Sequence, residues 1–221
     1  MSIDTQRHIT IFDPSQHKLP IHIIGAGATG SHITYALAKL GFEDVTVWDF
    51  DIVEAHNVAN QLYGLEDVGK PKVVALQNYI KRATNVEIKI KNEPCTENSK
   101  LAGIIFLLTD TMVSRGEIWK TIKLNFDVNL MVETRMGASS GIIHALNPNV
   151  IELCKCWEGT LFSDDKGERS ACGGRISVGP TAITLTGYAV WSMIQHLNGN
   201  GKNVVAFDIP TFSLNAFNWK S

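Results

Sequence analysis

The sequence has few cysteines, little net charge and no long apolar run, and each shortage argues against a class of protein. Four of its 221 residues are cysteines and no C-x-x-C pair occurs, so the usual zinc-knuckle spacing is missing. A net charge of −2 argues against nucleic acid or an anionic membrane as the main partner, because both require a basic surface. No stretch approaches the roughly 20 apolar residues of a membrane span, so we expect no membrane-spanning helix.

The cysteines and the N-terminal residues together predict a cytoplasmic location. Residues 1–5 lack the charged-then-apolar layout of a signal peptide, and cysteines without such a signal indicate a reducing compartment. Cys154 and Cys156 would share one face of a strand, and with Cys172 they could provide three thiolates. Small cysteines packed in a hydrophobic core are the commoner outcome.

A nucleotide-binding turn is predicted near the N-terminus. The apolar residues 21–24 read as a buried strand, and they lead into the G-x-G-x-x-G spacing of Gly25, Gly27 and Gly30. The first glycine allows a tight turn, the second lets phosphate approach the backbone, and the third lets helix and strand pack closely. A helix then ends at Gly41, a second strand covers residues 45–48, and Asp49 follows where an acid can hold a ribose.

The alternation of strand and helix patterns predicts one α/β domain, residues 1–221, with a Rossmann-like, doubly wound and mostly parallel sheet. A C-terminal antiparallel extension is expected after residue 129, where two strands are separated by a short glycine-containing connection. A polar stretch over 156–179 has no sustained period, which is typical of a functional or mobile loop. The remaining predicted elements are helices over 69–83, 113–124 and 180–199 and strands over 86–90, 102–109, 129–134, 141–146, 204–207 and 212–217.

The segment after the second strand narrows the nucleotide-binding prediction. It reads DFDIVEAHNVANQ over residues 49–61 and GKPK over residues 69–72. This resembles the ThiF/MoeB/HesA superfamily, the ubiquitin-activating-enzyme-like adenylyltransferases, whose pattern is D-x-D-x-V-x-x-x-N-x-x-R-Q followed by G-x-x-K. The resemblance extends from about Arg7 to Gly199.

The resemblance implies an enzyme that binds ATP and Mg²⁺. It would adenylate the C-terminal carboxylate of a small ubiquitin-like or sulfur-carrier protein that ends in glycine. The family also implies a homodimer and a crossover loop, here at about residues 157–179. Within the motif, Asp51 belongs to the nucleotide-binding pattern, and Asn57 matches an asparagine near the phosphates, although a simple turn asparagine is the alternative.

The chemistry requires positive charge around the phosphates, because a carboxylate must attack the phosphorus of a polyanion. Backbone N–H groups of Gly27, Ala28 and Gly30 supply part of that field at a helix start. Lys72 is the second predicted source of positive charge. A cation in a helix's first turn opposes the helix dipole and destabilises the fold by roughly 0.3–1 kcal/mol. An anionic ligand bound over that helix end would make the interaction of the cation favourable.

Asp110 is the candidate metal ligand. It ends an apolar strand and precedes a helix, where ligands collect in such sheets, although a helix N-cap is the competing interpretation. Asp110 also stands five residues before Arg115, as the family's magnesium-binding aspartate precedes its own arginine. We therefore expect Asp110 to bind metal and Arg115 to steady the site.

Three further positions bear on catalysis. Arg7 matches an N-terminal arginine that reaches the triphosphate in relatives, sometimes that of a partner subunit, although a solvated arginine is an equal alternative. Asn60 stands where relatives place an arginine that donates to the phosphates, and losing one such donor typically costs roughly 3 kcal/mol. Cys172 lies where ThiF-like relatives carry a reactive cysteine, and a thiolate there could hold the carrier as a thioester.

Two other functions remain open at this point. Because Asn60 replaces the arginine of relatives, the chain could instead be a non-catalytic, nucleotide-binding subunit of a heterodimeric activating complex. A nicotinamide-dependent oxidoreductase could use the same glycine turn, but it leaves the motif over residues 57–72 and the spacing of Asp110 and Arg115 unexplained.

Overall fold

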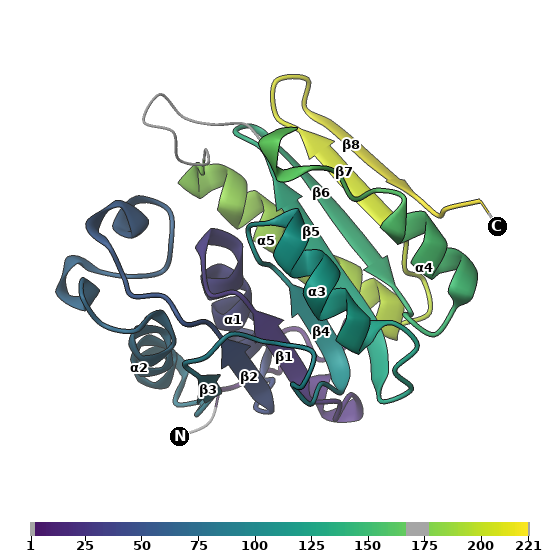
Figure 1. Ribbon diagram of the computed structural model, residues 1–221. Helices are drawn as coiled ribbons and strands as arrows, with labels where there is room; N and C mark the ends of the chain where they lie inside the picture. The colour runs from purple at the N-terminus through teal and green to yellow at the C-terminus, as the bar shows by residue number, and fades with distance from the viewer. Residues whose placement is uncertain (1–2, 167–176, 221) are drawn as a thin grey trace.

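The structure is a computed structural model that describes residues 3–166 and 177–220 (Figure 1). Within these residues, one eight-stranded sheet has the order β3-β2-β1-β4-β5-β6-β7-β8. Its strands are β1 (Ile21–Ile24), β2 (Val45–Trp48), β3 (Lys89–Lys91), β4 (Gly103–Leu107), β5 (Val128–Met136), β6 (Ser140–Leu146), β7 (Val204–Asp208) and β8 (Ser213–Phe217).

The sheet changes from parallel to antiparallel at β5. β1 pairs in parallel with β2 and with β4, β2 with β3, and β4 with β5. From β5 to β8, each strand pairs antiparallel with the next along the chain. The predicted α/β fold with a C-terminal antiparallel extension is therefore confirmed.

Helices cover both faces of the sheet. Figure 1 shows α3 and α4 in front of the strands, and α1 and α5 behind them. The α-helices are α1 (Ala28–Leu40), α2 (Lys72–Thr84), α3 (Met112–Ile122), α4 (Ile151–Glu158) and α5 (Gly179–Leu197). Short 3₁₀ turns are η1 (Pro14–Gln16), η2 (Ala55–Ala59), η3 (Leu65–Asp67) and η4 (Asp164–Lys166).

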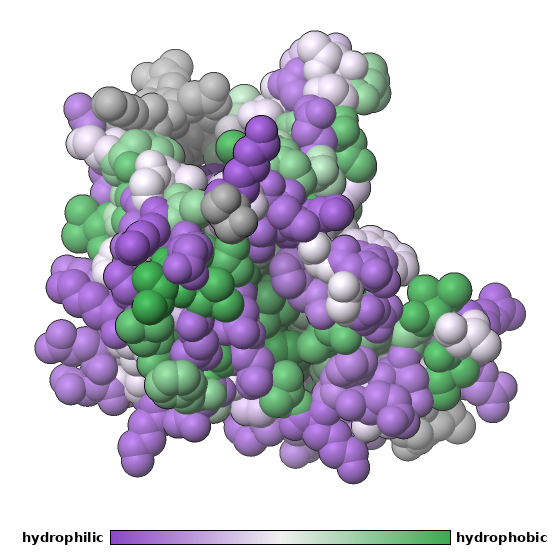
Figure 2. Space-filling view, turned by 90° about the vertical axis from the view of Figure 1, so that its right-hand side faces the viewer, coloured by the Kyte–Doolittle hydropathy of each residue, from purple (hydrophilic) through white to green (hydrophobic). Residues whose placement is uncertain are grey.

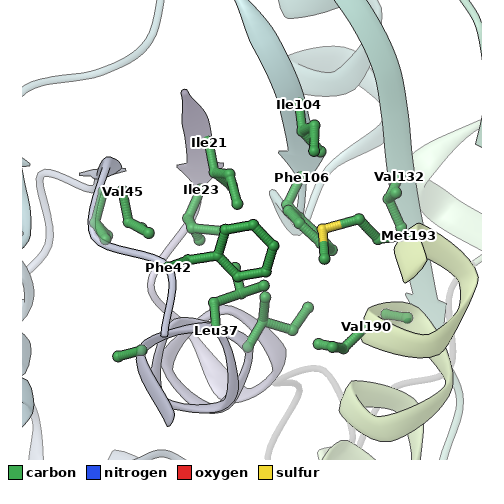
Figure 3. Packing of buried hydrophobic residues seen from close by; sticks show 14 of the residues in the cluster. Ile21, Ile23, Leu37, Phe42, Val45, Ile104, Phe106, Val132, Val190 and Met193 are labelled. Carbon is green, nitrogen blue, oxygen red and sulfur yellow. The ribbon is translucent and has the colours of Figure 1, made fainter. Parts of the chain in front are cut away.

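Successive side chains of the buried strands serve two separate cores, because neighbouring residues of a strand point to opposite faces. In β4, Ile104 and Phe106 pack in the core with α1, α2 and α5, and Ile105 and Leu107 pack in the core with α3 and α4. Figure 3 shows the first core, where Leu37 of α1 and side chains of α5 gather around the strands. Strands buried on both faces explain the continuous apolar runs of the sequence.

The start of one predicted helix was wrong. Helix α2 begins at Lys72 rather than at residue 69, because Gly69 has a φ of +89° and Pro71 forms a bridge with Ile52. The sequence also missed α4. Its apolar and polar residues partly alternate, and a helix of only 8 residues that buries just Cys154 and Trp157 leaves little helical periodicity to detect.

The far edge of the sheet is open to solvent. β8 is exposed along its whole length. Figure 2 views the molecule from this side and shows several groups of hydrophobic side chains with hydrophilic ones between them. Across residues 3–166 and 177–220, none of the helices combines the length and apolar character that a membrane span requires.

Leu37 tests the first core. Leu37→Ala should lower the free energy of unfolding by about 2–5 kcal/mol, because a fully buried leucine leaves a cavity among Phe106 and its neighbours. Urea denaturation measures the change. Leu65→Ala is the matched control, since Leu65 is 75% exposed and its loss should alter stability by less than about 0.5 kcal/mol. Equal effects of the two substitutions would contradict the described packing.

Candidate functional site

A cavity of about 1170 Å³ lies at the carboxyl ends of the parallel strands. Its walls come from residues that follow β1, β2 and β4, from η2, and from the β5–β6 hairpin. This is the edge where ligands bind in open α/β sheets. The volume exceeds the roughly 300–1,000 Å³ of an ordinary small-molecule pocket, so a nucleotide leaves room for part of a second reactant.

Most predicted site residues line this one cavity. They come from segments up to 90 positions apart, and the fold brings them together at the same edge. Those lining it are Gly25, Gly27, Ala28, Asp49, Asp51, Asn57, Asn60, Lys72, Asp110 and Arg115. Lys72 and Asp110, which must face the same triphosphate if adenylation is the reaction, therefore share one cavity.

The glycine turn shows why two of its positions exclude side chains. Gly25 has a φ of +103°, and a Cβ there would lie 2.9 Å from the carbonyl oxygen of Leu108. A Cβ on Gly30 would overlap the carbonyl oxygen of Gly25, so Gly30 lets α1 approach β1 rather than line the cavity. A Cβ on Gly27 would meet nothing within 4 Å, which places open space where the sequence predicts phosphate.

Asp49 and Tyr63 hold the turn from opposite sides. The backbone N–H of Ala26 donates to Asp49 Oδ2 at 2.7 Å, and the Tyr63 hydroxyl donates to the Ala26 carbonyl at 2.7 Å. Asp49 Oδ1 also accepts from the N–H of Asp51 at 2.8 Å. Burial raises the pKa of Asp49 above its ordinary value, although nearby Lys72 and these backbone bonds oppose the shift. Asp49 thus fixes the turn in addition to its predicted role at the ribose.

Positive charge is available on two sides of the cavity. Helix α1 starts at Ala28 without a side-chain cap, so the N–H groups of its first turn can donate to an anion. Lys72 Nζ lies 2.7 Å from Asp51 Oδ2, and Lys72 is only 7% exposed. Asp51 therefore holds Lys72 at the cavity wall. Asn57 Oδ1 accepts from the N–H of Glu54 at 2.8 Å, which closes η2 while Asn57 lines the cavity.

The structure removes the capping alternative for Asp110. The N-cap of α3 is Thr111, whose side chain accepts from the N–H of Ser114. Asp110 is exposed and lines the cavity, and its carboxylate makes no hydrogen bond or ion pair with residues 3–166 or 177–220. A carboxylate with no structural partner at this edge is the donor type that Mg²⁺ prefers.

Arg115 belongs to a buried charge cluster around Glu133. Arg115 donates from Nη1 to Glu133 and from Nη2 to the Thr109 carbonyl. Arg135 Nε donates to Glu133 at 2.8 Å, and His144 Nδ1 lies 2.6 Å from its second oxygen. Burial alone would raise the pKa of the fully buried Glu133, but Arg115, His144 and Arg135 together lower it to about 2. Through the Thr109 carbonyl, Arg115 holds the backbone beside Asp110, and its role in the chemistry stays a prediction.

Asn60 is engaged in a structural contact. Its Nδ2 donates to the carbonyl of Ser177 at 3.2 Å, next to the start of α5. Its Oδ1 is buried, and no partner for it occurs in the described part of the chain. An acceptor oxygen cannot replace an arginine toward a phosphate, so the departure from the family pattern is a real loss of charge here.

Other predicted residues lie elsewhere. The neighbour of Arg7, His8, contacts the carbonyl of Leu40 at the C-terminal end of α1, opposite to the glycine turn, and Arg7 itself is exposed and does not line the cavity. Cys172 lies outside the described residues, so its reactivity stays a prediction. The expected strand with Cys154 and Cys156 on one face was wrong. Both lie on α4, where positions two apart point in different directions.

Sequence reasoning missed three residues that hold the site in place: Tyr63, Glu133 and Arg135. Tyr63 is an isolated aromatic residue in a loop, and it carries no periodicity or motif. Glu133 and Arg135 lie in a largely buried strand. Charged residues in such a strand are usually paired, and this was the signal that could have found them.

The sequence pattern of the ThiF family matches residues 7–221. The chain belongs to the ThiF family. It is 43% identical over 78 residues to the NEDD8-activating enzyme E1 catalytic subunit of Arabidopsis thaliana, a match that covers 34% of this chain and 17% of that protein. It is 30% identical over 105 residues to the adenylyltransferase and sulfurtransferase MOCS3 of Anopheles gambiae, covering 44% and 24% respectively. The resemblance to the ThiF/MoeB/HesA superfamily is confirmed.

Solved structures of other ThiF-like folds agree in architecture. Escherichia coli MccB superposes with a TM-score of 0.72 at 14% identity, covering 92% of this chain and 63% of MccB. PaaA gives 0.69 at 17% identity, covering 97% of this chain and 68% of PaaA. At these identities the likeness concerns the fold alone. The chain matches less than a quarter of the length of the two curated relatives and about two thirds of these structures.

The glycine turn gives a paired prediction. Gly30→Ala should destabilise the protein by about 1–3 kcal/mol or more, because backbone stands where the new methyl group must go. Gly27→Ala should leave stability within about 1 kcal/mol but weaken binding of an ATP analogue about tenfold or more, since it fills the phosphate approach. Thermal unfolding and calorimetric titration separate the two effects. Loss of stability in Gly27→Ala would contradict the assignment.

The lowered pKa of Glu133 predicts that the free energy of unfolding decreases in acid. Because its pKa falls from 4.5 when unfolded to about 2 when folded, its stabilisation is complete above pH 4.5 and is lost as the pH drops toward 2. The change amounts to roughly 3 kcal/mol. Urea denaturation between pH 2 and 7 measures it. Glu133→Gln should flatten this part of the profile and Glu43→Gln, an exposed control, should not; identical profiles would refute the buried cluster.

Proposed function

We propose that this ThiF-family chain is an ATP-dependent adenylyltransferase that activates the C-terminal carboxylate of a small ubiquitin-like or sulfur-carrier protein. A carboxylate oxygen forms a bond to the α-phosphorus of ATP, the bond from that phosphorus to the bridging oxygen breaks, and pyrophosphate leaves. The carboxylate is already ionised at neutral pH, so the reaction needs neutralised phosphates more than a base.

The observation that carries the proposal is the placement of Lys72, the uncapped start of α1 and Asp110 around one cavity. Two of these are positive and one can recruit a cation. Together they provide the electrostatic field that two approaching anions require. A dinucleotide-dependent oxidoreductase needs the glycine turn but has no comparable use for Lys72 and Asp110.

The residues present also fit a magnesium ion. Asp110 supplies a carboxylate that no described residue engages, and a cation there would join phosphate oxygens as its remaining ligands. When bound, Mg²⁺ would neutralise phosphate charge at the reacting edge. Arg115 would hold the Thr109 carbonyl and so keep the Asp110 segment in place.

The relatives support the substrate class. The names of two of them state activation of NEDD8 and adenylyl transfer coupled to sulfur transfer. MccB has been crystallised with ATP and, separately, with MccA. The β5–β6 hairpin end of the cavity offers space for the carrier's C-terminal residues beside the nucleotide. Transfer to Cys172 as a thioester, and dimerisation, are further parts of the proposal that rest on family resemblance.

Asn60 supports a second candidate function. Where relatives bring an arginine, this chain has an amide that is bonded to the backbone of Ser177. A catalytically weak or inactive nucleotide-binding subunit of a heterodimeric activating complex would tolerate this loss of charge. It would bind ATP without forming an adenylate.

ATP–pyrophosphate exchange in the presence of a glycine-terminated carrier protein tests the proposal. Exchange should fall about 10²–10³-fold in Lys72→Ala and in Asp110→Asn, because each loses one element of phosphate neutralisation. Lys81→Ala is the matched control, since it also loses an ion pair but lies away from the cavity. Asp110→Asn should additionally shift the dependence on Mg²⁺ to higher concentration, because the phosphate oxygens alone would then hold the cation.

The other outcomes separate the alternatives. Binding of an ATP analogue without exchange, with every carrier tried, favours the non-catalytic subunit. Binding of NADH in preference to ATP would contradict both functions. Unchanged exchange in Lys72→Ala would remove the residue from the phosphate site.

A further inference from the structure

The backbone around Asp110 is held from both sides, by two different parts of the chain. On the N-terminal side, Arg115 donates to the carbonyl of Thr109. On the C-terminal side, the N–H groups of Met112 and Val113 donate to the carboxylate of Asp164. The first contact is local, and the second spans 52 residues.

Asp164 belongs to η4, in the segment that follows α4. Its Oδ1 lies 2.7 Å from the nitrogen of Met112, and its Oδ2 lies 3.2 Å from the nitrogen of Val113. The first N–H groups of a helix have no partner within the helix. Thr111 satisfies that of Ser114, and Asp164 satisfies the two before it. The start of α3 is therefore completed by a distant carboxylate.

Because Asp164 caps α3, Asp110 is not needed to accept hydrogen bonds from the first N–H groups of this helix. A helix start attracts the nearest acceptor or anion, and Asp110 immediately precedes the N-cap residue. With Asp164 in place, Asp110 instead faces the cavity with no described partner. Without Asp164, the uncapped N–H groups of Met112 and Val113 would compete with a cation for the Asp110 carboxylate.

We propose that Asp164 is a positioning residue for Asp110: by capping α3 from the segment after α4, it keeps the Asp110 carboxylate available to a divalent cation. The inference rests on the metal-binding role of Asp110 in the proposed function.

The same segment also lines the cavity near the β5–β6 hairpin. Arg135 donates to the carbonyl and the hydroxyl of Thr160 at 2.6 and 2.8 Å, and its guanidinium lies 5.6 Å from the ring of Phe162. Phe162 lines the cavity. Residues 160–164 therefore contact the cavity wall near the β5–β6 hairpin at one end and the start of α3, next to Asp110, at the other. Docking of this segment and binding of the cation are linked.

Mn²⁺ binding in the presence of a non-hydrolysable ATP analogue tests this inference without requiring turnover. Asp164→Ala should weaken Mn²⁺ binding about 2- to 30-fold, the range expected when a helix cap is lost. Asp165→Ala is the matched control, because Asp165 is the exposed neighbour in the same turn. Amide hydrogen exchange at Met112 and Val113 should accelerate in Asp164→Ala and stay unchanged in Asp165→Ala.

A double variant separates positioning from general destabilisation. If Asp164 acts through Asp110, adding Asp164→Ala to Asp110→Asn should change Mn²⁺ binding no further. Wild-type Mn²⁺ affinity in Asp164→Ala despite faster amide exchange would overturn the inference, as would equal weakening in Asp165→Ala or no Mn²⁺ binding by the wild type. Absence of pyrophosphate exchange, with Mn²⁺ binding still weakened by Asp164→Ala, would overturn the proposed function and leave the inference standing.

Discussion

The close approach of Gly30 to the carbonyl of Gly25 is the constraint on which the proposed nucleotide site depends. No side chain fits between them, so α1 lies against β1 and its first turn opens at the carboxyl edge of the sheet. Asp49 and Tyr63 then hold the intervening Ala26 by its N–H and its carbonyl. A backbone fixed in this way presents its N–H groups to phosphate before any ligand arrives, which is the meaning of preorganisation at an anion site.

Three positively charged side chains in and beside the site are each held by a carboxylate. Lys72 is held by Asp51, and Arg115 and Arg135 are held by Glu133. Burying Glu133 among these groups is favourable only because every one of its oxygens has a charged or hydrogen-bonding partner. Asp110 differs from these groups, since its carboxylate lines the cavity and bonds to no described residue, as is also true of the exposed Glu97 and Glu117. The position of Asp110 at the carboxyl end of β4, next to the start of α3, is what makes it the proposed metal ligand.

The parts of the fold that could be predicted are those with a strong local signal. Continuous apolar runs identified β1 and β4, and the glycine at residue 41 marked the end of α1, where its φ is +98°. Predictions failed where local and long-range preferences disagreed. Pairing of Pro71 with Ile52 delays the start of α2, and the short α4 packs on the sheet through the buried Trp157, whose ring centroid lies 4.6 Å from that of Trp119. Neither contact is visible from neighbouring residues.

The sequence by itself determined the fold class and the family, because the glycine spacing and the motif over residues 49–72 are local patterns. It also identified a set of residues that line the cavity. Only the tertiary structure decided which polar groups are paired with other residues of the chain. It showed that Thr111 and Asp164 cap α3, that Asn60 is bonded to Ser177, and that Glu133 joins two arginines. These pairings join residues up to 117 positions apart, and hydrogen bonds over such separations are set by the packing of the sheet and not by any sequence neighbour.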